Sequence, residues 1–282
     1  VMDFYDIWFK DSTFSEYWYD ESWHPTRKRI ETIKIRGDKT IQDTIIFTHH
    51  GPVVWNKKHQ KSNIIGNSIP IGRAMKWLAH NPSLEAKAFY ELNRATNYDD
   101  FLKAIEYFSC PGQNFVFASN TGDIAIWQAT DIPVKWKNQG QFILDGSRSS
   151  NDWQLYAPSF HRPNVLNPER GFVSSANQNP VTEDYPYYYP GGYALPFRGA
   201  RINNQLNKLT NVNTNDLQQL QLDNTNLYAK RMLNEVIPIL EIIDLDEIEY
   251  EIFTKLVDWD FTYDGKSIQP TIFSRFSNIF HL

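Results

Sequence analysis

The chain has 282 residues, a net charge of −5 and one cysteine, Cys110. This length allows a sizeable core in one large domain, and the acidic balance, with no basic run longer than residues 27–29, argues against a nucleic-acid partner. A single cysteine excludes an internal disulfide, and its apolar neighbours favour a buried structural thiol over a nucleophile. No apolar run approaches the roughly 18 residues of a membrane span.

Residues 1–9 alternate between apolar and polar side chains, which predicts a strand. Its acids, Asp3 and Asp6, are candidate oxygen ligands, although two acids three residues apart are more often solvated than bound to a metal. The chain starts with Val1 rather than Met, so we expect an internal piece of a longer protein. The lack of a signal peptide is then uninformative.

Two hairpins are predicted next, a short aromatic one at 17–23 and a longer one over 30–48. His49 and His50 follow directly. Because adjacent residues on a strand point to opposite faces, we do not expect this pair to chelate a metal ion. Residues 63–70 are predicted to form a loop or a short strand.

Two helices follow. Apolar side chains recur at steps of three and four over residues 83–94, with Ser83 as the expected N-cap, and again from Asn97. Two β-type runs, 114–119 and 123–128, are joined by an Asn-Thr-Gly turn and predict a hairpin.

The most informative stretch runs from Gly171 to Ile202. It opens with a β-type run at 172–175 and passes into Asn177. An amide N–H just beyond a strand can donate to an oxyanion that develops on an acyl carbon, although a single Asn at such a position more often forms a turn. Two arginines, Arg198 and Arg201, follow in the same stretch.

This stretch resembles the penicillin acylase (penicillin amidase) family of N-terminal nucleophile hydrolases. A run of matches this long is specific. The matching motifs are Asn167-Pro168, Gly171-Phe172-Val173, Asn177-Gln178-Asn179-Pro180, Asp184-Tyr185-Pro186, Gly191-Gly192, Arg198 and Arg201-Ile202.

The resemblance implies roles for particular residues. Asn177 would donate to the oxyanion, and Arg198, or else Arg201, would orient the region around it. A structural Ca²⁺ would be held by the carboxylates of Asp3 and Asp6 and the carbonyl of Tyr5. The substrate pocket would include Phe89, Tyr90 and Gln113.

The resemblance also implies an α+β fold, the four-layer αββα sandwich of N-terminal nucleophile hydrolases, here incomplete. We expect a single domain over 1–282, strand-rich over 1–200 and helical over 201–282. The implied reaction is hydrolysis of an acyl amide, such as a β-lactam side chain or an N-acyl homoserine lactone, in the periplasm or outside the cell.

The nucleophile in this family is a serine at the N-terminus of the large subunit, and Val1 has no hydroxyl group. We therefore expect the serine to lie outside this chain, the chain alone to be inactive, and a small α subunit from the same precursor to be its partner.

The aromatic content of 15%, with nine tryptophans, supports a rival hypothesis from another class, a non-catalytic carbohydrate-binding or structural module. That hypothesis predicts tryptophans gathered on one exposed face, whereas the acylase hypothesis buries most of them.

Overall fold

The described chain packs as two compact units. The structure, a computed structural model, describes residues 1–37, 39–55, 71–189 and 191–279. The first unit contains Val1–Asn167 and Val181–Gly192, and the second contains Pro168–Pro180 and Tyr193–Leu282. The predicted loop or strand at 63–70 lies outside the described residues. The expectation of one domain over 1–282 stays a prediction.

The largest sheet of the first unit has the strand order β10-β1-β7-β6-β5-β4. Its strands are β1 (Met2–Trp8), β4 (Arg27–Ile35), β5 (Lys39–Thr48), β6 (Gly51–Trp55), β7 (Ile71–Trp77) and β10 (Leu144–Asp145). Neighbours pair antiparallel, except that β1 and β10 are parallel. β1 lies inside this sheet, and Tyr5 and Ile7, which share one of its faces, are fully buried in a cluster with Phe9, Tyr17 and Leu144, which confirms the predicted first strand.

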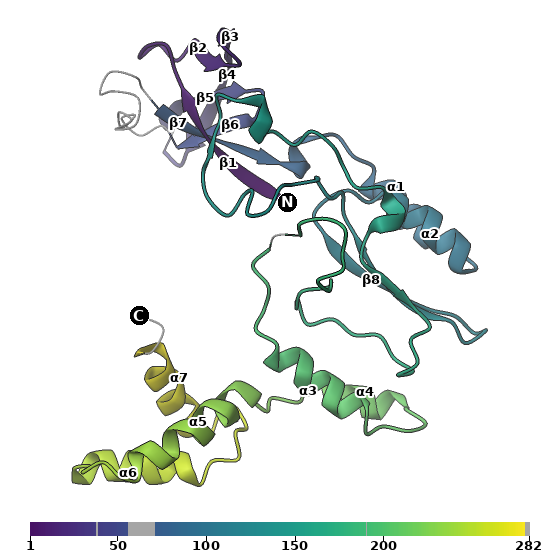
Figure 1. Ribbon diagram of the computed structural model, residues 1–282, viewed down its shortest axis with the longest axis vertical. Helices are drawn as coiled ribbons and strands as arrows, with labels where there is room; N and C mark the ends of the chain where they lie inside the picture. Colours follow the sequence, from purple (N-terminus) through teal and green to yellow (C-terminus); the bar gives the residue numbers. More distant parts are fainter. Residues whose placement is uncertain (38, 56–70, 190, 280–282) are drawn as a thin grey trace. The chain divides into compact units, whose positions relative to one another are not determined.

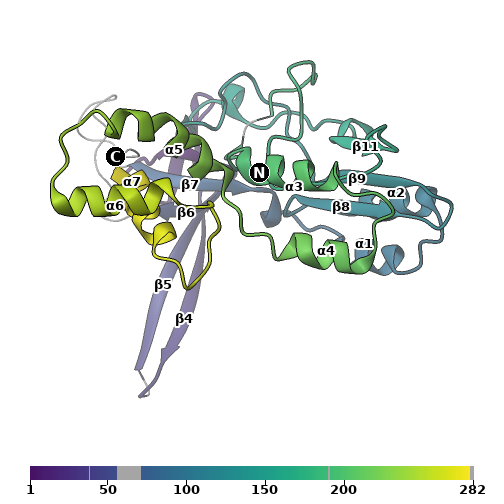
Figure 2. The same ribbon diagram turned by 90° about the horizontal axis from the view of Figure 1, so that it is seen from below.

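Both predicted hairpins in this region are confirmed. The short one pairs β2 (Glu16–Tyr19) with β3 (Ser22–Pro25). In the long one, β4 and β5 pair from Arg27 opposite Phe47 to Ile35 opposite Lys39. Figure 2 shows these two strands as a ribbon that extends beyond the rest of the sheet. Most of its side chains are exposed as a result.

A second sheet of the first unit packs against two helices. It has the order β11-β9-β8, with β8 (Gln113–Ala118), β9 (Ile124–Ala129) and β11 (Asn164–Leu166). The helices are α1 (Glu85–Leu92) and α2 (Tyr98–Glu106). Phe101, Ile105 and Phe108 fill the interface with this sheet. Asn97 caps α2 as its spacing predicts, but the predicted cap of α1 is wrong. Leu84 takes that position, and the Ser83 hydroxyl donates to Glu85 instead.

The regular elements described in the second unit are helices. Its helices are α3 (Phe197–Leu206), α4 (Thr214–Gln221), α5 (Leu227–Leu240), α6 (Glu247–Val257) and α7 (Gln269–Ile279). Figure 1 shows α5, α6 and α7 gathered together. Leu233, Leu256, Trp259 and Phe273 form their shared core. Side-chain caps from Asn213, Asn226 and Asp246 start α4, α5 and α6, respectively.

Candidate active site

Asn177 lies in a tight bend of the second unit. Its backbone is left-handed, with φ at 60°, a conformation that Asn tolerates better than most residues. The bend is held by hydrogen bonds. The Ala176 N–H donates to Gln178 Oε1 at 2.6 Å, and the Ala194 N–H donates to the Asn177 carbonyl at 2.9 Å. The Asn177 side chain itself is exposed.

Helix α3 brings Arg198 to this bend. Arg198 is the second residue of the helix, and its Nη2 donates to the Ala176 carbonyl at 2.7 Å and to Asn177 Oδ1 at 2.6 Å. Because a guanidinium group only donates, the amide oxygen of Asn177 must face Arg198, and its Nδ2 must point the other way. The structure thus fixes which end of the amide is presented as a donor.

The alternative arginine, Arg201, is engaged elsewhere. Its Nη2 lies 2.6 Å from Asp223 Oδ2, and its Nε donates to both oxygens of the same carboxylate. These hydrogen bonds from Arg201 lower the pKa of Asp223, although partial burial acts in the opposite direction. Of the two arginines, Arg198 is the one that contacts Asn177.

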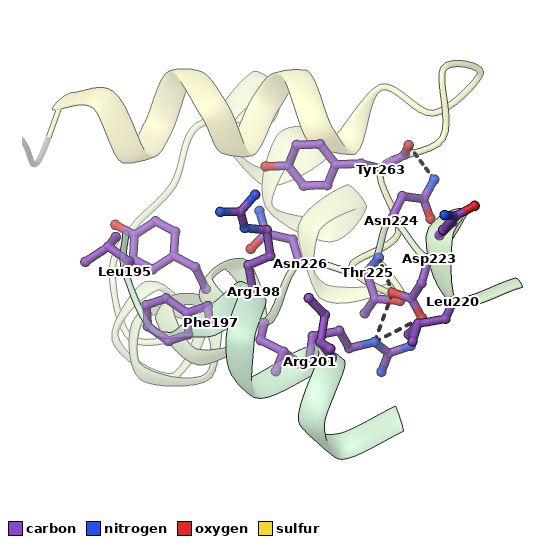
Figure 3. Close-up of a pocket in the computed structure, with 14 residues that line it drawn as sticks. Leu195, Phe197, Arg198, Arg201, Leu220, Asp223, Asn224, Thr225, Asn226 and Tyr263 are labelled. Atoms are coloured by element: carbon purple, nitrogen blue, oxygen red, sulfur yellow. Dashed lines mark hydrogen bonds and ion pairs between the residues drawn. The ribbon is translucent and has the colours of Figure 1, made fainter. Parts of the chain in front are cut away.

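A pocket of about 640 Å³ opens beside these arginines (Figure 3). Its walls are largely apolar, and the Arg198 guanidinium reaches both the pocket and the Asn177 bend. Such a cavity suits a ligand with an apolar body and one acceptor group. The apolar and aromatic lining residues are Leu195, Phe197, Ile202, Leu220, Leu227, Tyr228 and Tyr263.

The predicted strand at 172–175 is wrong. In the described chain these residues form no strand, and Asn177 therefore does not follow a strand end. The Ser174 hydroxyl donates to Asn203 of α3 at 2.8 Å, so α3 rather than a sheet holds the segment. A β-type composition forms a strand only where a neighbouring strand provides hydrogen bonds.

The expected calcium ligands do not come together. Asp3 and Asp6 are an odd number of residues apart on β1, so their side chains lie on opposite faces of the sheet. Asp3 is buried against Lys135, whereas Asp6 accepts from Arg73 at 3.3 Å. Tyr5, whose carbonyl is the third expected ligand, lies between two strands, with Leu144 of β10 on one side and Ala74 of β7 on the other. In this conformation the residues do not fit one calcium ion, and calcium binding by this segment stays a prediction.

The buried partner of Asp3 is a residue that sequence reasoning missed. Lys135 Nζ lies 2.6 Å from Asp3 Oδ2, and the Trp153 indole N–H donates to the same oxygen at 2.6 Å. A lysine in a loop carries no sequence signal for burial. Gly140 is the nearest hint, because its φ of 86° and a Cβ position only 2.2 Å from Asp3 Oδ1 leave no room for another residue.

The expected pocket residues belong to the first unit. Phe89 and Tyr90 lie on α1 and are 52% and 59% exposed. Phe89 contacts Phe108 edge-on, and Gln113 is exposed at the start of β8. Their role as pocket residues stays a prediction.

The expectation that His49 and His50 point apart is wrong. The two residues form the turn between β5 and β6, so they do not alternate as strand residues do. Their ring centroids lie 3.8 Å apart, and both rings face Asp152. Gly51 closes the turn with φ at 135°, where a Cβ would lie 2.2 Å from the Met75 carbonyl. The Gly-Pro that follows the histidines is the turn signal that could have revealed this arrangement.

Tryptophan burial does not decide between the acylase and the binding module, because Trp23, Trp77 and Trp136 are exposed while others are enclosed. Trp153 and Trp259 are buried in separate cores, and the Trp127 indole donates to Tyr98 at 2.7 Å beneath α2.

Preorganised side-chain amide donors are one means by which enzymes stabilise an oxyanion on an acyl carbon. Comparison with known proteins agrees with this class. The penicillin amidase family matches residues 1–281, and the chain belongs to that family.

Relatives and solved structures extend the comparison. The chain is 25% identical to an acyl-homoserine lactone acylase, QuiP, of Pseudomonas aeruginosa over 89% of its length. It is 20% identical over 92% of its length to a penicillin acylase 2 proenzyme of Pseudomonas sp. strain SE83. The chain spans about a third of the length of these relatives, 31% of the lactone acylase and 32% of the penicillin acylase 2 proenzyme.

A thermostable penicillin G acylase from Alcaligenes faecalis matches the fold with a TM-score of 0.71 and 19% identity, over 94% of this chain and 47% of that one. The chain therefore has a mixed α+β fold of the penicillin acylase type. None of the described helices is both long and apolar enough to cross a membrane.

Proposed function

We propose that this chain is part of an amidohydrolase that cleaves acyl amides, with Asn177 as an oxyanion donor. The observation that carries the proposal is the 2.6 Å hydrogen bond from Arg198 to Asn177 Oδ1, which turns the amide N–H group outward. A preorganised donor of this kind stabilises the transition state by about 3 kcal/mol. Arg198 acts by positioning Asn177, and its charge adds a favourable field for an anion.

The nucleophile in this proposal is an N-terminal serine that lies outside this chain, on the large subunit that it shares with these residues. Its own α-amine takes the hydroxyl proton as the oxygen attacks the acyl carbon, and the proton then passes to the leaving amine as the C–N bond breaks. An α-amine is suited to this task because it titrates near neutrality. Water then hydrolyses the acyl ester.

The proposed substrates follow the names of the relatives, an N-acyl homoserine lactone or the acyl side chain of a β-lactam. Exposed aromatic side chains at Phe89 and Tyr90 are available to contact the acyl group. We further propose the four-layer αββα sandwich for the complete enzyme, a small α subunit as its partner, and a periplasmic or extracellular location.

The test is Asn177→Ala in the longer protein that carries the serine, assayed with chromogenic phenylacetyl and aliphatic amides. We expect kcat to fall by roughly two to three orders of magnitude with little change in the melting temperature. Asn211→Ala is a matched control, because Asn211 also has a left-handed backbone, with φ at 53°, and lies between α3 and α4. Equal kcat values for the parent and Asn177→Ala would reduce Asn177 to a turn residue.

A further inference from the structure

Two histidines and an aspartate converge beside the largest sheet of the first unit. His49 and His50 form the β5–β6 turn, and Asp152 follows a short 3₁₀ helix, η2 (Ser149–Asn151). His50 Nδ1 lies 3.2 Å from Asp152 Oδ1, and His49 Nε2 lies 3.5 Å from Asp152 Oδ2. One ligand atom from each residue falls within 4.8 Å of the other two.

Two atoms of this cluster make no hydrogen bond although they are buried. They are His50 Nδ1 and Asp152 Oδ1, and among the described residues no other buried side-chain nitrogen or oxygen is in this position. The His50 side chain is 0% exposed. The two atoms lie 3.2 Å apart, yet no hydrogen bond joins them, as expected when the ring nitrogen carries no hydrogen and both atoms can only accept.

Leaving such a group unsatisfied costs about 1–3 kcal/mol. Two unsatisfied groups that face each other indicate a shared partner between them. The two atoms are spaced as neighbouring ligands of one ion would be. Ligands about 2.0–2.1 Å from a tetrahedral zinc ion lie about 3.3 Å apart, which agrees with the observed separation of 3.2 Å.

Each candidate ligand is also oriented through its other polar atom. His50 Nε2 lies 3.1 Å from the Gly146 carbonyl, an acceptor, so Nε2 carries a hydrogen and Nδ1 faces the cluster. His49 Nδ1 lies 2.9 Å from the Tyr17 hydroxyl, which directs Nε2 toward Asp152. The Tyr19 hydroxyl donates to Asp152 Oδ2 at 2.6 Å and leaves Oδ1 for an ion. Metal-binding histidines and carboxylates are held in this way.

We propose that His49 Nε2, His50 Nδ1 and Asp152 Oδ1 bind a divalent transition-metal cation of the zinc class. Two imidazole nitrogens select such a cation over calcium, which prefers oxygen ligands. The His49 side chain is 31% exposed, so a water molecule can reach the fourth position. The ion ties the β5–β6 turn to the segment around Asp152, and its ligands belong to the first unit, whereas Asn177 and Arg198 belong to the second.

The test is a zinc titration of the untagged chain after removal of metals with a chelator, followed by calorimetry and metal analysis. We expect one Zn²⁺ per chain and a higher melting temperature with zinc than without it. Asp152→Asn, which preserves shape, and His49→Gln, at the more exposed ligand, should each weaken binding by roughly a hundredfold or more. Tyr17→Phe, which removes only an orienting hydroxyl, should weaken it by about 10–100-fold.

The matched control is His161→Gln. His161 Nδ1 also lies near a tyrosine hydroxyl, that of Tyr187 at 2.6 Å, but His161 is not part of the cluster. This variant should bind zinc like the parent, and X-ray absorption of the parent should show imidazole nitrogens at about 2.0 Å. Absence of zinc binding by the parent would overturn the proposal, and so would equal affinity in the parent, Asp152→Asn and His49→Gln.

Discussion

Replacing Lys135 by methionine should leave the Asp3 carboxylate buried without a cation. Both Asp3 oxygens lie within 2.7 Å of Lys135 Nζ, and the two side chains are only 1% and 2% exposed. The Trp153 N–H still satisfies one oxygen in the variant, but it carries no full charge. Breaking a buried pair from one side lowers the free energy of unfolding by about 3–5 kcal/mol.

Urea unfolding monitored by tryptophan fluorescence measures this loss. With a slope of about 2 kcal/mol per molar urea, a loss near 4 kcal/mol lowers the midpoint by about 2 M. Lys10→Met is the matched control. Lys10 pairs with Glu16 at the same distance, 2.6 Å, but the two side chains are 46% and 41% exposed. This exposed pair should contribute no more than about 1 kcal/mol.

A second variant separates the buried charge from the lost side chain. Asp3→Asn combined with Lys135→Met leaves no unpaired charge, and the amide oxygen introduced by Asp3→Asn would still accept from Trp153, so much of the lost stability should return. A loss below about 1 kcal/mol for Lys135→Met would refute the reasoning. A double variant as unstable as the single one would show that packing, not charge, explains the effect.

Three further predictions concern pH, calcium and activity. The hydrogen bonds from Arg201 lower the pKa of Asp223, so they stabilise the protein fully above the unfolded pKa of about 3.9. This stabilisation is lost as the pH falls through the lower folded pKa. In urea unfolding, Arg201→Met should therefore cost stability at pH 6 and progressively less below about pH 4. The predicted calcium site needs a conformation in which Asp3 and Asp6 meet, and it requires a calorimetric signal with CaCl₂ that Asp6→Asn removes. The chain alone should hydrolyse no chromogenic amide, because the proposed serine lies outside it.

For each of these three predictions, one result would contradict it. If the stability difference between the parent and Arg201→Met stayed constant from pH 6 to pH 2.5, Arg201 would not act through the titration of Asp223. Calcium that binds Asp6→Asn as it binds the parent would exclude the Asp3 and Asp6 site. Turnover by the chain alone, abolished by a change of any one of its serines or of Cys110, would place the nucleophile inside it.

Local sequence was sufficient where neighbours along the chain set the structure. The hairpin over 30–48 forms as predicted because its strands alternate and are joined by a tight turn containing Gly37, whose φ is 91°. Asn97 and Asp246 start helices because their side chains accept backbone N–H groups two or three residues ahead. The motifs from Asn167 to Ile202 likewise pointed to the family that the comparison found.

The choice between Arg198 and Arg201 required the tertiary structure. The two residues are three positions apart on α3, so both project from nearby parts of the helix surface. Sequence spacing cannot say which of them meets Asn177. The structure places Asp223 beside Arg201, and Arg198 is left to hold the amide.

Contacts between distant parts of the chain decided the remaining features. Asp3 meets Lys135 across 132 positions, and His50 meets Asp152 across about a hundred, distances over which no periodicity carries information. Burial then changes the chemistry. A carboxylate that water would solvate on an exposed strand needs a cation when it is enclosed, and a ring nitrogen without a hydrogen bond becomes a potential ligand. The sequence by itself therefore determined the family, the hairpins and the start of α2 at Asn97, whereas only the fold decided which polar groups lost their water and which partners replaced it.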